Sequence, residues 1–146
     1  MGPAVQKAID AITGQFGADR VAIAADREGG AYVIVEGVPL GAPFAQDETW
    51  IGFHIPSTCP YADVYPHFLR PDLARRDGGA LGEGLSTGHS FPDQAALKMA
   101  GTMPARTGVQ ASRRSNRKDS AGLETPLHKL LKVIQWLKSR QAGSGR

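Results

Sequence analysis

The sequence predicts an α+β domain in which two helices pack on an antiparallel sheet. Three observations predict this class: a helical repeat of apolar residues near the N-terminus, short strand-like segments between residues 21 and 69, and an amphipathic helix near the C-terminus. That order of elements is typical of helices packed against an antiparallel sheet. With 146 residues, of which 41% are hydrophobic, the chain can bury one core. We expect a single domain over residues 1–140 and a flexible Gly/Ser tail over 141–146.

The first helix is expected to follow Pro3, a residue that suits a first helical turn. Gly14 and Gly17 can end it. Apolar residues recur at helical spacing in between, at Ala4, Val5, Ala8, Ile9 and Ile12.

Three or four antiparallel strands are expected next, as a meander. Val21–Ala25 and Tyr32–Val35 flank the glycine-containing loop Asp26–Gly30 and read as a hairpin. The alternation in Thr49–Ile55 puts its apolar residues on one face of a third strand. Four prolines break regular pairing between residues 56 and 71, so Tyr65–Leu69 is predicted as a short edge strand.

Residues 72–122 are rich in Gly, Ser, Arg and Asp, and we expect a long irregular loop there, with a helical stretch over Pro92–Ala100. A loop of this length is uncommon in a compact domain unless it has a function. We therefore interpret this segment as the functional region.

The last helix is expected over Pro126–Arg140, with Thr125 as its N-cap. Lys129, Lys132 and Lys138 are placed on the solvent side, and Trp136 reads most simply as core, with a partner groove as the alternative. The predicted apolar stripe comprises Leu127, Leu130, Leu131, Ile134 and Leu137.

Charge is distributed unevenly along the chain. Residues 1–105 hold 7 basic and 12 acidic side chains, whereas residues 106–146 hold 10 basic and 2 acidic ones. The basic third could meet phosphate or an acidic protein surface, or could simply be a solvated face. Binding to nucleic acid is disfavoured because no aromatic residue lies between Ala105 and Leu123 to stack on bases.

Other classes are excluded by what the sequence lacks. No apolar run is long enough to cross a membrane, so no membrane partner is expected. One cysteine cannot form an internal disulfide, and we expect a cytoplasmic protein. The four histidines show no ligand spacing, and neither a metal nor a cofactor is predicted.

Ser112 is the candidate nucleophile that the residues themselves suggest, since it is followed directly by Arg113 and Arg114. A serine hydroxyl needs a base or preorganised charge to react. The arginines cannot be bases, but they can stabilise an oxyanion. His89 is the predicted proton acceptor. The alternative is an ordinary loop serine beside solvated arginines.

Several segments are similar to a known family. Val38–Gly41 and Cys59–Phe68 are similar to the Leu-Pro-x-Gly, Pro-x-x-Tyr-Pro-Asp-Ala and Pro-Asp-x-Phe segments of divergent bacterial ubiquitin-conjugating-enzyme-like proteins, with Cys59 where tyrosine is usual. Phe53–Pro56 belongs to the same match. Gln110–Arg114 and Trp136–Leu137 resemble the Gln-x-x-Ser-Arg pattern and the final Trp-Leu of that group. The resemblance covers roughly residues 20 to 140.

This resemblance implies a ubiquitin-conjugating fold and a partnership with a ubiquitin-like modifier protein and its activating enzyme. In eukaryotic members the catalytic cysteine lies about a dozen residues before the following helix, and counting back from Leu123 lands on Ala111 and Ser112. The His-Pro-Asn tripeptide of those enzymes is missing, and His89 is only a loose substitute. The resemblance thus implies an oxyester on Ser112 or, alternatively, an inactive adaptor that binds the modifier or the activating enzyme.

Cys59 is the alternative nucleophile, with His54 or His67 as a partner. As a structural residue it would be a small half-buried side chain beside a turn. The target protein that would receive the modifier is not indicated by the sequence.

Overall fold

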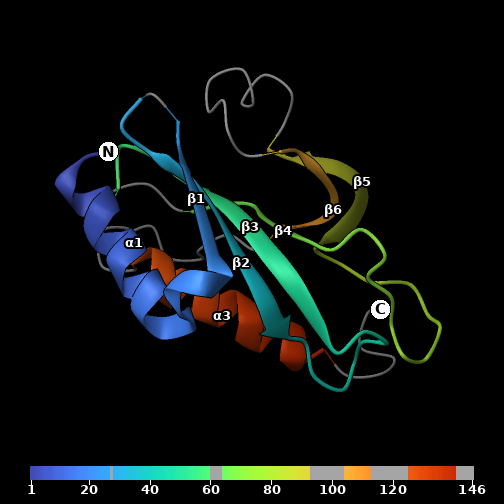
Figure 1. Ribbon diagram of the computed structural model, residues 1–146. Helices are drawn as coiled ribbons and strands as arrows, with labels where there is room; N and C mark the ends of the chain where they lie inside the picture. The colour runs from blue at the N-terminus through green and yellow to red at the C-terminus, as the bar shows by residue number, and fades with distance from the viewer. Residues whose placement is uncertain (27, 60–63, 93–103, 113–124, 141–146) are drawn as a thin grey trace.

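The computed structural model confirms the α+β class, with two helices on one side of an antiparallel sheet (Figure 1). The structure describes residues 1–146 except 27, 60–63, 93–103, 113–124 and 141–146. The predicted tail and most of the predicted helix Pro92–Ala100 lie outside the described residues. The described elements are α1 (Pro3–Phe16), the 3₁₀ turn η1 (Ala18–Arg20), β1 (Val21–Ala25), β2 (Ala31–Pro39), β3 (Glu48–Ile55), β4 (His67–Leu69), β5 (Leu85–Phe91), β6 (Arg106–Ala111) and α3 (Pro126–Lys138).

The sheet has six strands in the order β1-β2-β3-β4-β6-β5, and every neighbouring pair is antiparallel. Strands β1 to β4 form the predicted meander. The prediction that the segment containing β4 is an edge strand was wrong, because β6 pairs with its free side through His67↔Ala111 and Leu69↔Val109.

The expectation of an irregular loop over residues 72–122 was also wrong in part, because β5 and β6 lie within it. The sequence of β5 is Leu-Ser-Thr-Gly-His-Ser-Phe, and only its two ends, Leu85 and Phe91, are buried. A strand of this kind has no hydrophobic alternation to reveal it. It is stabilised by pairing with β6 rather than by its own propensity.

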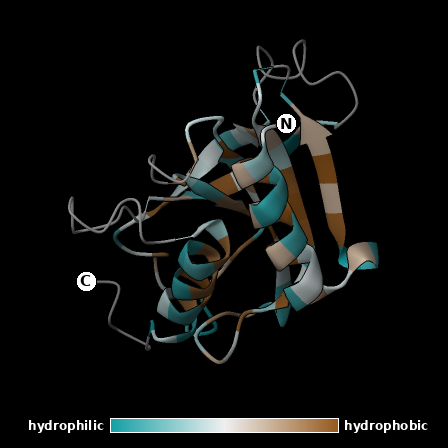
Figure 2. Ribbon diagram, turned by 90° about the vertical axis from the view of Figure 1, so that its left-hand side faces the viewer, coloured by the Kyte–Doolittle hydropathy of each residue, from teal (hydrophilic) through white to brown (hydrophobic). Residues whose placement is uncertain are grey.

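The main core lies between the inner face of the sheet and the two helices. Helix α1 buries four of its five predicted apolar residues, Val5, Ala8, Ile9 and Ile12, while Ala4 is exposed. The predicted inner face of β3 is confirmed, since Ile51, Phe53 and Ile55 are fully buried. Helices α1 and α3 contact each other over this face, as the turned view shows (Figure 2).

Helix α3 begins as predicted, with the Thr125 hydroxyl oxygen accepting a hydrogen bond from the backbone N–H of His128 at 3.1 Å. The predicted stripe needs correction: Leu131 is 38% exposed, Val133 is buried although the stripe left it out, and Lys129, placed on the solvent side, is only 3% exposed. Successive i, i+3 and i+4 steps from Pro126 reach Lys129, Leu130, Val133 and Leu137, so the buried arc is rotated from the expected one. Trp136 is partly buried and packs on the core, in line with its simpler interpretation.

A second, smaller hydrophobic cluster lies on the outer face of the sheet, away from the helices. Its buried members are Ala24, Ile34 and Phe91, with Tyr32, Trp50 and Phe68 packed around them. Phe91, at the end of β5, packs over Gly52 of β3, where an added Cβ would lie 2.5 Å from its ring. The sheet therefore curls, and β5 reaches back over the outer face.

Two glycine substitutions test this packing. Gly52→Ala is expected to lower the free energy of unfolding by about 1–3 kcal/mol, because the new methyl group overlaps the Phe91 ring. Gly14→Ala, in α1 with open space around it, is expected to raise it by about 0.5–1 kcal/mol. Urea denaturation measures both changes, and equal effects of the two substitutions would contradict the close approach at Gly52.

Candidate functional site

Ser112 is exposed and follows directly after β6. Its backbone N–H donates to the Gly84 carbonyl oxygen at 2.7 Å, and its hydroxyl oxygen accepts a hydrogen bond from Gln110 Nε2 at 3.0 Å. The backbone at Gly84 has φ +86°, and an added Cβ there would lie 3.0 Å from the Trp136 ring. Helix α3 thus supports the residue that holds Ser112 in place.

The structure does not bring His89 to Ser112. His89 pairs with Gly108 of β6, four residues from Ser112, or about 13 Å along an extended strand. Its Nε2 atom lies 3.0 Å from the Ser86 hydroxyl oxygen. The role of His89 as the proton acceptor for Ser112 stays a prediction that these contacts do not support.

Arg113 and Arg114, predicted to stabilise an oxyanion, lie outside the described residues. Three other cations of the basic third have partners in the fold or lie within it. Arg106 Nη2 lies 2.6 Å from Glu36 Oε2, Lys129 is buried, and Arg140 lies over the Trp136 ring. Burial holds the pKa of Arg140 below its ordinary value, the nearby Arg75 lowers it further, and Glu83 opposes both effects. These cations are poorly placed to bind phosphate.

Cys59 is 8% exposed and belongs to the main core. Burial raises the pKa of its thiol, so less of the reactive thiolate forms. The histidines considered as its partners are engaged elsewhere: His54 bonds to Asp26, and the His67 ring is fully buried with its centroid 5.2 Å from that of Phe53. These surroundings favour the structural interpretation of Cys59.

We expect Cys59 to react slowly with iodoacetamide in the folded protein, at least about tenfold slower than in the urea-unfolded chain, because the thiol is buried and its pKa is raised. Intact mass spectrometry follows the alkylation. Reaction of the folded protein as fast as that of the unfolded chain would restore Cys59 as a candidate nucleophile.

An Asp–His pair lies on the outer face of the sheet, at the end where β1 and β3 end and β2 begins. His54 Nε2 is 2.6 Å from Asp26 Oδ2. The Asp26 side chain is only 5% exposed, whereas that of His54 is 38% exposed. The carboxylate also accepts hydrogen bonds from the backbone N–H groups of Glu28 at 2.7 Å and Gly30 at 2.8 Å.

These hydrogen bonds determine the charge of the pair. Burial by itself raises the pKa of the Asp26 carboxyl, but the bonds from His54 and from the two backbone N–H groups outweigh it, so this pKa lies below its ordinary value. An ionised carboxylate only accepts hydrogen bonds. Nε2 of His54 therefore carries a hydrogen, and in the neutral form of the ring Nδ1 is an acceptor.

Gly30 makes this arrangement possible. A Cβ at position 30 would lie 2.4 Å from the Ile55 carbonyl oxygen and 2.5 Å from Asp26 Oδ2. No side chain fits there without displacing the carboxylate or the end of β3. The loop Asp26–Gly30 is thus shaped around the carboxylate.

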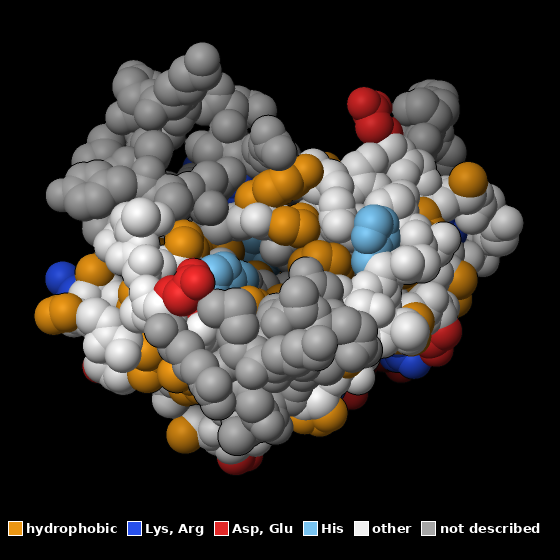
Figure 3. Space-filling view, turned by 90° about the horizontal axis from the view of Figure 1, so that it is seen from above, with side chains coloured by type: hydrophobic (Ala, Val, Ile, Leu, Met, Phe, Trp, Pro, Cys, Tyr) orange, Lys and Arg blue, Asp and Glu red, His pale blue; other side chains and the backbone are white. Residues whose placement is uncertain are grey.

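A pocket of about 260 Å³ opens beside His54. Its wall includes four aromatic rings, those of Tyr32, Tyr65, Phe68 and Phe91, and the Ser90 residue. The space-filling view shows histidine side chains beside hydrophobic ones in a hollow of the surface (Figure 3). The pocket combines a hydrogen-bond acceptor, backed by a buried negative charge, with aromatic walls.

Protonation of Asp26 should remove its contribution to stability. Because the folded-state pKa is lowered, that contribution is present above the ordinary aspartate pKa of about 3.9 and is lost as the pH falls through the lower folded-state value. We expect the unfolding free energies of wild type and Asp26→Asn to differ most at pH 5 and to converge towards pH 2. Urea denaturation across this range measures the difference, and a constant gap would contradict the lowered pKa.

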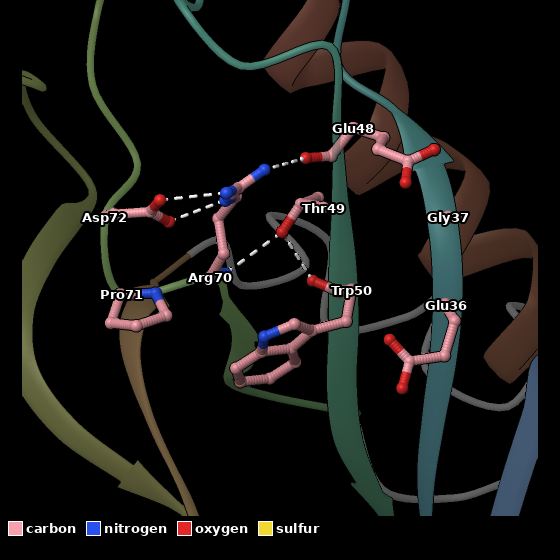
Figure 4. A pocket seen from close by; sticks show the side chains of 8 residues that line it. All are labelled: Glu36, Gly37, Glu48, Thr49, Trp50, Arg70, Pro71 and Asp72. Atoms are coloured by element: carbon pink, nitrogen blue, oxygen red, sulfur yellow. Dashed lines mark hydrogen bonds and ion pairs between the residues drawn. The ribbon is translucent and has the colours of Figure 1, made fainter.

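A second pocket, of about 270 Å³, lies beside Trp50 (Figure 4). The Arg70 guanidinium forms a fork with Asp72, with N–O distances of 2.6 and 2.8 Å, and donates to the Glu48 carbonyl oxygen at 2.9 Å. The Arg70 backbone N–H donates to the Thr49 hydroxyl at 3.0 Å. The Arg70 side chain already has its partners, and we interpret this pocket as a structural tie between β3 and the segment after β4.

Sequence reasoning singled out His54 only as a partner for Cys59 and missed Asp26. A signal was present: His54 alternates with Phe53 and Ile55, so it lies on the face opposite to theirs. The pairing of the three strands could not be predicted closely enough to place Asp26 beside it.

Neither a metal-binding group of side chains nor a membrane-spanning helix is found among the described residues. No three His, Cys, Asp or Glu side chains among them are grouped so that they could hold a metal ion. None of the helices that the structure describes is long and apolar enough to span a bilayer.

Comparisons with known proteins leave the family open. No family model, no curated protein and no solved structure matches the chain.

Proposed function

We propose that this chain is a conjugating enzyme that accepts the C-terminus of a ubiquitin-like modifier from an activating enzyme, as an oxyester on Ser112, and transfers it to a target. The observation that carries the proposal is the placement of Ser112. It is an exposed hydroxyl held by Gly84 and Gln110 at the end of β6. A residue that receives another protein's tail must be both accessible and fixed.

The hydrogen bonds at Ser112 suit this chemistry. Because Gln110 Nε2 donates to the hydroxyl oxygen, the hydroxyl hydrogen points elsewhere and can pass to a base. Ester formation joins Oγ to the carbonyl carbon of the tail, releases the thiol of the activating enzyme, and moves the hydroxyl proton to that thiolate. Arg113 and Arg114 remain the proposed oxyanion donors.

The segments that carry the family resemblance are also linked in space. Trp136 packs against Gly84, and Gly84 accepts the hydrogen bond from the Ser112 N–H. This link supports a common role for Gln110–Ser112 and Trp136. The architecture of an N-terminal helix, a four-stranded meander and a C-terminal helix agrees with the proposed fold at the level of α+β class.

An adaptor that binds the modifier or the activating enzyme without catalysis is the second candidate. The observation that favours it is the position of His89, which is hydrogen-bonded to Ser86 and not to Ser112. In this case the modifier or the activating enzyme would still bind after the loss of the Ser112 hydroxyl.

Covalent charging distinguishes the two. The protein is mixed with ATP, an activating enzyme and its ubiquitin-like modifier, and intact mass spectrometry follows the adduct. We expect an adduct that resists thiol reductant, is cleaved by hydroxylamine, persists in Cys59→Ala and is absent from Ser112→Ala.

The matched control is Ser86→Ala, which removes another exposed hydroxyl on the neighbouring strand and should leave charging intact. An adduct lost only in Cys59→Ala would show that Cys59, and not Ser112, is the nucleophile. Binding of the partners with no adduct in the wild type would favour the adaptor.

A further inference from the structure

We propose that the outer-face pocket beside His54 binds a primary alkylammonium group, the end of a lysine side chain. Its identity as the lysine that receives the modifier rests on the function proposed above. The binding itself follows from the walls, the charge and the position of the pocket.

The walls suit a cation. The rings of Tyr32 and His54 lie 4.6 Å apart, those of Phe68 and Phe91 5.1 Å apart, and Tyr32 meets Phe91 at 6.0 Å in an edge-on contact. Aromatic faces attract a nearby ammonium through their quadrupole. The rings are also fixed by one another, so little side-chain freedom is lost on binding.

The charge of the site also suits a cation. Asp26 is buried, and its carboxylate lies 2.6 Å from His54 Nε2; in the neutral form of that ring Nδ1 is an acceptor, to which an ammonium can donate. The described residues that line the pocket include no lysine or arginine to oppose a positive ligand. A neutral amide of the same length would lose the attraction of both the carboxylate and the rings.

The pocket lies on the same face as Ser112. Phe68 pairs with Gly52 on one side and Gln110 on the other, and the Gln110 side chain bonds to the Ser112 hydroxyl. Continuing the first register by two residues and the second by one, past the observed pairs, places His54 and Ser112 on either side of Pro66, two strand spacings or about 10 Å apart. An amine held near His54 therefore approaches an ester on Ser112 across one residue.

Transfer from that position balances without a further reactant. The bound ammonium first gives one proton to Nδ1 of the neutral His54 ring. The resulting amine nitrogen attacks the ester carbonyl carbon, the C–N bond forms and the C–Oγ bond breaks. One amine proton is lost from nitrogen, and the departing Ser112 oxygen gains a proton. The products are an amide and the free hydroxyl.

The experiment uses the whole chain and two small probes, Nα-acetyl-lysine N-methylamide and its Nε-acetylated form. NMR follows the ring signals of His54, Tyr32 and Phe68, at a pH where the His54 signals show the neutral ring. We expect saturable shifts with the lysine probe and at least about tenfold weaker binding of the acetylated one, a difference of the size expected for a cation among aromatic rings.

Variants assign the effect. Asp26→Asn should weaken binding of the lysine probe at least about fivefold, because the amide removes the charge and can turn Nδ1 of His54 into a donor. If that variant does not fold, His54→Phe, which keeps a ring against Tyr32, decides in its place. Glu36→Gln removes an equal charge beside Trp50 and should leave binding unchanged, as should Ser112→Ala.

Equal binding of the two probes, or wild-type affinity in Asp26→Asn or His54→Phe, would overturn the inference. The test needs neither modifier nor activating enzyme, so it separates the two proposals. Lysine-selective binding without charging of Ser112 would support the binding pocket and contradict the proposed enzyme. Charging of Ser112 without lysine-selective binding would support the enzyme and contradict the binding pocket.

Discussion

The packing of Phe91 against Gly52 is the contact on which the outer face of this protein depends. It joins the end of β5 to β3, two strands beyond β5's own partner β6, and so requires a curled sheet. A side chain at position 52 would hold the ring away. With Phe91 in place, the rings of Tyr32 and Phe68 gather around it and the pocket acquires its walls. The helices cover the inner core, whereas this contact shapes the pocket beside His54.

The Asp26–His54 pair depends on the same curvature for its surroundings and on its own loop for its charge. A carboxylate with a 5% exposed side chain stays ionised only because three hydrogen bonds replace the water it has lost. Two of these bonds come from the backbone and fix the loop, and the third fixes the histidine tautomer. For stability alone, well-packed apolar residues would often serve as well as a buried ionic group. A buried charge aimed at a half-exposed imidazole is therefore better explained by a site than by the core.

Hydrophobic periodicity determined which elements could be predicted from the sequence. Helix α1 and strands β1 to β3 were predictable because their buried residues recur at 3.6 or 2 residues, as Ile9–Ile12 and Ile51–Ile55 do. Strand β5 has buried residues only at its ends, so its pattern carries no period, and its existence follows from pairing with β6. Lys129 was misplaced because residue type was given more weight than position in the buried arc. Of the candidate site, Ser112 was found from its neighbours in sequence, whereas Asp26 and His54 meet only through strand pairing.

The two proposals place different demands on one face of the sheet. An acceptor hydroxyl must be reachable by a flexible tail, which suits the exposed Ser112 at the end of β6. An incoming amine must lose a proton before it attacks, which is favoured where a neutral acceptor replaces water around it. If the registers of β3–β4 and β4–β6 are continued to Pro66, His54 and Ser112 lie on either side of it, so these tasks are separated by about two strand spacings instead of being concentrated in a triad. Under this arrangement loss of the histidine would slow transfer and leave charging intact, whereas loss of the serine would abolish both.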